Sequence, residues 1–249
     1  MAEELTVRAV DRALELLEQF GPDQPALGVS DLARMTGLNK GTVYRLLNTL
    51  QQRGYVQQDP ETQKYRLGVT LFRLGALAQL DMDVRRIALP YMRELRDKSQ
   101  ETVNLNVVSG FNRVCVECIE TPHSVRYLIY TGYTGPLHRG ASGKAMLAFL
   151  PESYQEAVML GLLPEERIKL RKDLEQIRRQ GYAWTRGDRL PDAASVSAPI
   201  LGHEGTTVAG LTISGPRTRF TDDVIERCRV LVTAAAKEIS IHMGFGAPR

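Results

Sequence analysis

The segment Gly140-Ala141-Ser142-Gly143-Lys144-Ala145 contains the residue types of a phosphate-binding loop. Such a loop requires a glycine five residues before its second conserved glycine, and a serine or threonine directly after its lysine. In this chain His138 and Ala145 stand at these two positions, so we do not expect the segment to bind a nucleotide. It still predicts a helix start, whose free backbone N–H groups favour an anion. A helix start without a ligand is the alternative.

Cysteine and histidine spacing does not predict a metal centre. Cys115-Val116-Glu117-Cys118 has the spacing of half a zinc site, but no second pair follows it. On a strand, side chains three positions apart point to opposite faces, so we expect two ordinary strand cysteines. Neither a Ser-His-Asp order nor a paired-carboxylate pattern stands out. We therefore predict no catalytic residue, no metal site and no cofactor. The histidines are scattered at His123, His138, His203 and His242.

Positive charge gathers in one short part of the chain. Residues 1–33 carry seven acidic and two basic side chains, whereas residues 34–66 carry six basic and two acidic ones. The predicted helix from Lys40 to about Arg53 contains no acid, which suits a surface that faces DNA phosphates. A solvated basic face is the alternative. The outward positions expected to contact DNA are Lys40, Thr42, Tyr44, Arg45 and Asn48.

The elements around this helix predict a winged helix-turn-helix over residues 1–68. Apolar residues recur at helical spacing from Val7 to Leu17, and we expect Ser30 to cap a second helix that runs to about Met35. A glycine-containing turn leads to Asn39, which can cap the third helix. Residues 55–58 and 64–67 then read as two strands joined by a turn, which form the wing. Lys64 and Arg66 alternate onto one face of the wing and complete the predicted DNA surface.

The rest of the chain predicts a linker helix over 69–82 and an α+β domain over 83–249. A helix is expected over 83–100, with Pro90 as a kink or a break. Separate groups of strands and helices then indicate a sensor domain with helices packed on a sheet. The apolar linker helix favours association of chains, as a homodimer or a dimer of dimers. Strands are expected near 102–107, 113–120, 125–131, 194–201 and 207–215, and helices near 142–150, 152–161, 164–180 and 221–243.

Sequence motifs in both halves resemble the IclR family of bacterial transcriptional regulators. In the first half these are the run from Ser30 to Leu47, Gly54-Tyr55-Val56 and Tyr65-Arg66-Leu67-Gly68. The resemblance implies a GAF-like α/β effector-binding domain with a mainly antiparallel sheet. The motifs of the second half are Glu101-Thr102-Val103-Asn104-Leu105, Gly135-Pro136-Leu137-His138, Ala141-Ser142-Gly143-Lys144-Ala145, Gly181-Tyr182-Ala183, Ala198-Pro199 and Ile213-Ser214-Gly215-Pro216.

The resemblance also implies an effector pocket and shows one departure from the family. After Gly181-Tyr182-Ala183 the family has an acidic run, but here Thr185 and Arg186 replace acids. This change removes a repulsion from a bound acid, and Arg186 adds attraction if its side chain turns inward. Small polar residues on strands, which could equally form a solvent face, match pocket positions of the family. The implied effector-binding residues are Ser124, Tyr127, Ala141, Ser142, Thr185, Ser195, Thr212 and Ser214.

Composition is that of a globular protein, with 43% hydrophobic and 24% charged residues. The chain has no run of about 18 apolar residues, no signal-peptide pattern and three cysteines, so we expect a cytoplasmic protein with free thiols and no membrane span. We predict a regulator that binds double-stranded operator DNA and is controlled by a small organic effector, a carboxylic acid. An enzyme fused to a DNA-binding head is the alternative, and an architectural DNA-binding protein without a ligand is a second. Effector identity, operator sequence and the sign of regulation are not predicted.

Overall fold

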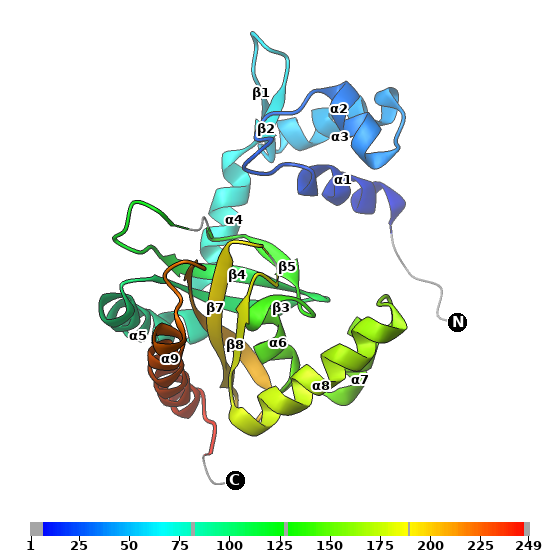
Figure 1. Cartoon of the computed structure of the whole chain (residues 1–249). Coiled ribbons are helices and arrows are strands. Elements are labelled where there is room, and N and C mark those ends of the chain that lie inside the picture. The colour runs from blue at the N-terminus through cyan, green and yellow to red at the C-terminus, as the bar shows by residue number, and fades with distance from the viewer. Residues whose placement is uncertain (1–6, 81–82, 127–128, 189, 247–249) are drawn as a thin grey trace. The chain divides into compact units, whose positions relative to one another are not determined.

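The computed structural model divides the chain into two compact units, which comprise residues 1–81 and 82–249. Within the described residues, no helix combines the length and the apolar character needed to cross a bilayer. The structure describes residues 7–80, 83–126, 129–188 and 190–246 (Figure 1).

The N-terminal unit is a helix-turn-helix followed by a two-stranded wing and a further helix. The side chain of Asn39 accepts a hydrogen bond of 2.8 Å from the Thr42 N–H, which confirms it as the cap of the third helix. The second helix differs from prediction, because Gly28 is its cap and the Asp31 carboxylate accepts the Gly28 N–H at 3.2 Å. Ser30 therefore lies inside the first turn. The elements are α1 (Arg8–Glu18), α2 (Val29–Thr36), α3 (Lys40–Gln52), β1 (Val56–Gln58), β2 (Tyr65–Leu67) and α4 (Val69–Leu80).

The C-terminal unit is built on one antiparallel sheet with the strand order β5-β4-β3-β8-β7-β6. Helices α5 and α9 cover one face, and α6 lies on the other with α7 and α8 beyond it (Figure 1). The predicted α+β fold class is confirmed. The elements are α5 (Asp83–Ser99), β3 (Thr102–Ser109), β4 (Asn112–Ile119), β5 (Thr134–Pro136), α6 (Gly140–Leu147), α7 (Glu152–Met159), α8 (Pro164–Gln180), β6 (Ala183–Arg186), β7 (Ala193–Leu201), β8 (Thr207–Pro216) and α9 (Asp222–His242).

A β-bulge in β4 sets which side chains face α6. The register shifts so that Glu117 lies opposite Leu105, while Cys115 lies opposite Asn106. Val116 is thus an extra residue, which interrupts the alternation of side chains between the two faces of the strand. Cys115 and Cys118 lie opposite Asn106 and Asn104, which share one face of β3. The prediction that the two thiols point to opposite faces is therefore wrong.

Four further elements differ from the sequence prediction. The strand expected over 125–131 is absent among its described residues, because β5 takes the edge of β4 on which it would pair. The Val125 carbonyl instead accepts a hydrogen bond of 2.9 Å from Arg219 Nη1. Pro90 does not break α5, which runs through it. The short strands β5 and β6 were not predicted.

Candidate functional site

The sheet face that meets α6 carries rows of small polar side chains from neighbouring strands. Thr185 on β6 lies opposite Ser195 on β7, which in turn lies opposite Ser214 on β8. Ser197 and Thr212 form the next cross-strand pair. Sequence alternation predicted the polar positions on β7 and β8, and the family resemblance implied Thr185 on β6. Strand pairing joins these positions into one surface.

Ser197, Thr212 and Ser214 are buried and Thr185 and Ser195 are half-buried, and hydrogen bonds connect these side chains. The Thr185 and Ser195 hydroxyls lie 3.3 Å apart, and those of Ser197 and Thr212 lie 2.8 Å apart. Asn104 extends the network, since its Nδ2 donates to Ser214 Oγ at 3.2 Å. Without such hydrogen-bond partners, buried polar groups would destabilise the fold. The network therefore links the hydroxyl groups of this face to one another.

Helix α6 lies close to the sheet because its facing residues are small. All eight of its residues are buried. A Cβ atom on Gly210 of β8 would lie 2.7 Å from Met146 Cγ, so glycine is needed for this approach. Ser142 is 6% exposed, and its buried Oγ has no hydrogen-bond partner within the described part of the chain. A buried hydroxyl in this state is a group that a ligand can satisfy.

A cavity opens between the start of α6 and the polar face of the sheet. Its empty space is about 470 Å³ when the open mouth is included. Apolar groups from two loops and from β7 share the wall with the polar groups. The described lining residues are Asn104, Arg113, Ile129, Gly140, Ala141, Ser142, Thr185, Asp188, Leu190, Ala193, Ala194, Ser195, Thr212 and Ser214.

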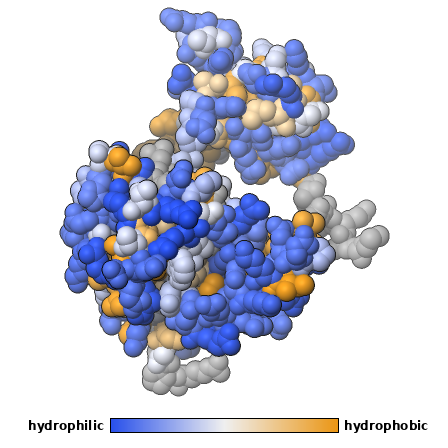
Figure 2. All heavy atoms as spheres, viewed as in Figure 1, coloured by the Kyte–Doolittle hydropathy of each residue, from blue (hydrophilic) through white to orange (hydrophobic). Residues whose placement is uncertain are grey.

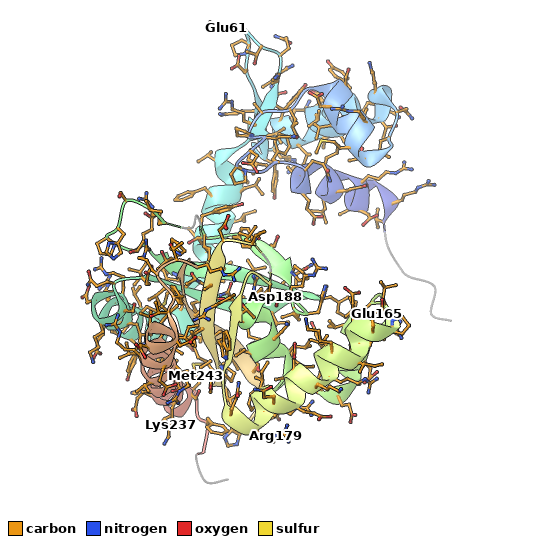
Figure 3. All side chains as sticks on the ribbon, in the orientation of Figure 1. Glu61, Glu165, Arg179, Asp188, Lys237 and Met243 are labelled. Atoms are coloured by element: carbon orange, nitrogen blue, oxygen red, sulfur yellow. The ribbon has the colours of Figure 1, made fainter. Side chains whose placement is uncertain are left out.

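The carboxylate of Asp188, which is labelled in Figure 3, binds at the N-terminus of α6, where a ligand anion could otherwise bind. Its Oδ2 accepts the Gly140 N–H at 3.0 Å and lies 2.8 Å from Lys144 Nζ, which also lies 3.1 Å from Asp173 Oδ2. Burial alone would raise the pKa of Asp188, but the hydrogen bonds from Lys144 and Gly140 outweigh it and lower the pKa. The first N–H of α6 is thus already bound to a carboxylate.

Arg113 brings a buried cation to the same cavity. Its residue is 5% exposed, and it lies opposite Val108 of β3, on the face that also presents Asn104. The side chain passes over Gly135 of β5, where a Cβ atom would lie 2.3 Å from Arg113 Nη1. Sequence reasoning missed Arg113, although its place on the predicted strand 113–120 and the glycine at 135 were visible signals.

The structure brings six of the eight predicted effector-binding residues to this cavity, as its lining shows. Ser124 is exposed and does not line it, and Tyr127 lies outside the described residues. Arg186 does not turn inward. Its Nη2 lies 2.7 Å from Asp222 Oδ1, and its guanidinium stacks 5.6 Å from the Trp184 ring centre. The added attraction considered for Arg186 is therefore wrong.

The thiols beside the cavity are not activated. Burial raises the pKa of Cys115 to about 12 and that of Cys118 to about 11. Both thiols are therefore protonated near neutral pH. Within the described residues, no group of three or more histidine, cysteine or acidic side chains is placed to hold a metal ion.

The predicted DNA-contacting residues lie on the surface of the N-terminal unit. Four of them are exposed along α3, namely Lys40, Tyr44, Arg45 and Asn48. The aromatic residue among them, Tyr44, is 58% exposed. Thr42 is half-buried beside the Asn39 cap.

Lys64 and Arg66 are exposed on the wing, whose tip carries Glu61 (Figure 3). Asp59 shapes this tip by accepting the backbone N–H groups of Glu61 and Thr62 at 2.9 and 3.0 Å. Hydrogen bonds from these two amides lower the pKa of Asp59.

Comparison with known proteins agrees with this architecture. Residues 9–60 match the IclR helix-turn-helix domain, and residues 77–241 match the C-terminal domain of the bacterial transcriptional regulator IclR. The regulator XynR of Escherichia coli is 30% identical over 97% of this chain and 99% of its own length. The structure of an IclR transcriptional regulator from Silicibacter sp. TM1040 is 28% identical, with a TM-score of 0.83 over 96% of this chain and 98% of that one.

A third relative shares the fold at lower sequence identity. It is an IclR homologue from Microbacterium hydrocarbonoxydans in complex with 4-hydroxybenzoate, 24% identical, with a TM-score of 0.79 over 94% of this chain and 98% of that one. The family models cover most of the chain, and both of its units carry the matching fold. The chain therefore belongs to the IclR family and is a DNA-binding transcriptional regulator.

Proposed function

We propose that this regulator binds a small organic acid in the cavity below α6, and that the bound acid changes its affinity for operator DNA. The observation that carries the proposal is the cavity itself, where Ser142, Thr185, Ser195, Thr212 and Ser214 converge from four elements. Hydroxyl groups donate to a carboxylate, and the Oγ of Ser142 is available to do so. The fold accommodates an acid in one relative, the complex with 4-hydroxybenzoate.

The DNA surface in this proposal is α3 together with the wing. Lys40, Tyr44, Arg45 and Asn48 would enter the major groove, with Thr42 at its edge, because α3 presents them on its exposed side. Lys64 and Arg66 would hold the phosphates beside it. The exposure of these groups and the lack of acids on α3 support this assignment.

We infer that the regulator acts as a homodimer or a dimer of dimers. Large apolar side chains are exposed on α4, with Val69 at 77%, Phe72 at 78% and Leu77 at 51%. Figure 2 also shows hydrophobic residues on the surface of the N-terminal unit. A patch of this kind favours association with a second copy. A ligand that binds one arrangement of the two DNA-binding units of a dimer better than another would then shift operator affinity. Residues 69–82 would transmit the change from the effector-binding domain to the DNA-binding domain.

The cavity is proposed to bind its ligand and not to transform it. Its hydroxyls engage one another, as Thr185 does with Ser195, and are not paired with a base in these contacts. A serine or threonine nucleophile needs an adjacent base to react. The alternative of an enzyme with a DNA-binding head predicts turnover of the bound acid.

The proposal is tested by DNA binding in the presence of acids. Operator sites are selected from random DNA with the full chain, and affinity is measured by fluorescence anisotropy with a panel of aliphatic and aromatic acids. We expect at least one acid to change the affinity severalfold, and Ser214→Val and Thr212→Val to weaken that response. Lys172→Met, on an exposed part of α8, is the control. An acid response that both valine variants retain in full, or consumption of the acid, would overturn the proposal.

A further inference from the structure

Two ionised side chains stand out in the described lining of the cavity, Arg113 and Asp188. They reach it from distant parts of the sheet, because Arg113 lies on β4 and Asp188 follows β6, the last strand in the sheet order. The charge of the cavity wall is therefore uneven. What each group offers a ligand depends on the partners that it already has.

Asp188 is an anion held in place by the protein. Lys144 contacts both Asp188 and Asp173, so one cation serves two carboxylates. Lys169 also acts on Asp188 through its charge, and with Lys144 it lowers the pKa of Asp188, so this carboxylate is ionised at neutral pH. The Gly140 N–H, which an acidic ligand could otherwise use, donates to Asp188. A ligand carboxylate placed here would meet a like charge, which is unfavourable at short range.

Arg113 is a cation for which the fold makes room. Gly135 lies opposite Arg113 on the neighbouring strand, and its missing side chain leaves the space that the guanidinium crosses. A guanidinium presents a planar set of N–H donors that matches a carboxylate in two parallel hydrogen bonds. The hydroxyl of Ser142 and the amide of Asn104 line the same cavity as this cation.

We propose that Arg113 holds the carboxylate of the effector, and that Asp188 makes the cavity select monocarboxylates against dicarboxylates. This inference rests on the proposed function and assigns the acid to the guanidinium on β4 and not to the N-terminus of α6. The rest of the ligand lies against hydroxyls and apolar groups, which include Ile129, Leu190 and Ala193. The effector is therefore an acid with one charged end and a short neutral body.

The test compares two matched series of probes on the full chain by calorimetry, with the fluorescence of Trp184, the residue before the lining residue Thr185, as a second readout. The first series is benzoate, benzamide and terephthalate, and the second is butyrate, butyramide and succinate. We expect a monocarboxylate of at least one series to bind more tightly than its amide and its dicarboxylate by tenfold or more. Absence of monocarboxylate binding at millimolar concentration in both series would overturn the inference.

Variants then separate the roles of the two side chains. Arg113→Gln should weaken the monocarboxylate by about ten- to a hundredfold, as expected for a charge-assisted hydrogen bond. Gly135→Ala keeps every charge but displaces the guanidinium, so it should weaken the same acid severalfold. Asp188→Asn should improve the dicarboxylate by about tenfold relative to the monocarboxylate. Arg86→Gln, which removes the same charge from an exposed site, is the control and should change neither affinity.

The outcomes distinguish this inference from the proposed function. If acids bind and alter DNA affinity while Arg113→Gln and Gly135→Ala leave acid affinity unchanged, the role of Arg113 is wrong and the proposed function stands. If dicarboxylates bind as tightly as monocarboxylates, the role of Asp188 is wrong. If no acid alters DNA affinity, the proposed function fails as well. Melting of each variant without ligand shows whether a lost affinity comes from misfolding.

Discussion

Replacing Lys144 by methionine should destabilise the C-terminal unit by leaving two carboxylates without their shared cation. Lys144 Nζ lies 2.8 Å from Asp188 and 3.1 Å from Asp173, and the three side chains are 11%, 26% and 31% exposed. Removing one partner of a fully buried pair costs about 3–5 kcal/mol, whereas an exposed pair contributes about 0–1 kcal/mol. The partial exposure of both aspartates places the expected loss at about 2–3 kcal/mol at pH 7.

The dependence of this loss on pH has a definite sign. In the wild type, burial opposes ionisation of Asp188, but Lys144 and the Gly140 amide lower its pKa, so its stabilisation is present at neutral pH and lost only in strong acid. In the variant the pKa of Asp188 is higher than in the wild type, because both the hydrogen bond and the charge of Lys144 are lost while burial remains. Asp188 then takes up a proton as the pH falls toward about 4, near the unfolded value. The stability difference between variant and wild type should therefore shrink between pH 7 and pH 4.

Urea unfolding measures the effect directly, because the only tryptophan of the chain, Trp184, lies in the C-terminal unit and reports its unfolding. Lys172→Met removes the same charge from an exposed position of α8 and should change the free energy of unfolding by less than about 0.5 kcal/mol. A Lys144→Met variant as stable as this control at pH 7 would refute the reasoning. So would a loss of stability that grows as the pH is lowered.

Three further predictions concern the N-terminal unit. Arg45→Ala should cost about 1–3 kcal/mol of operator binding if it pairs with a guanine, whereas Lys64→Ala should weaken all sequences alike and reduce the salt slope by about 1 in anisotropy titrations. Wild-type affinity and slope in both variants would contradict the assigned DNA surface. Phe72→Ser should shift the mass from light scattering toward that of one chain, since it removes an exposed ring from α4, and an unchanged mass would exclude this surface from the interface. Asn39→Ala should lower the stability of the N-terminal unit by about 0.5–2 kcal/mol in thermal unfolding followed by circular dichroism, because it removes the cap of α3. No change there would show that the cap contributes nothing.

Local patterns predicted much of this structure. Asn39 is recognisable as a cap because capping depends on the three residues that follow it. The polar positions on β7 and β8 follow from strand alternation, which requires no knowledge of the partner strands. The predicted cap of α2, Ser30, is wrong, because the helix begins earlier with Gly28 as its cap, and the Asp31 side chain bonds back to the Gly28 amide.

Contacts between distant residues account for what the sequence did not reveal. Asp188 and Gly140 are 48 positions apart in the sequence, so no local pattern near either residue predicts their hydrogen bond. The bulge at Val116 shifts the faces of β4, and a spacing of three between Cys115 and Cys118 therefore behaves as a spacing of two. Arg113 reaches the cavity only because Gly135 pairs beside it.

The burial of α6 on every side has a mechanical consequence for signalling. Its first four residues are Gly140, Ala141, Ser142 and Gly143, whose short or absent side chains can hardly rearrange to make room for a ligand. The helix is packed between the sheet and α8, at a density that does not compress. A ligand that needs extra room at Ala141 or Ser142 must therefore displace α6 as a rigid body, and α8, which packs against α6, must move with it. Amide hydrogen exchange in α8, a helix outside the described lining of the cavity, should then respond to a ligand that it does not touch.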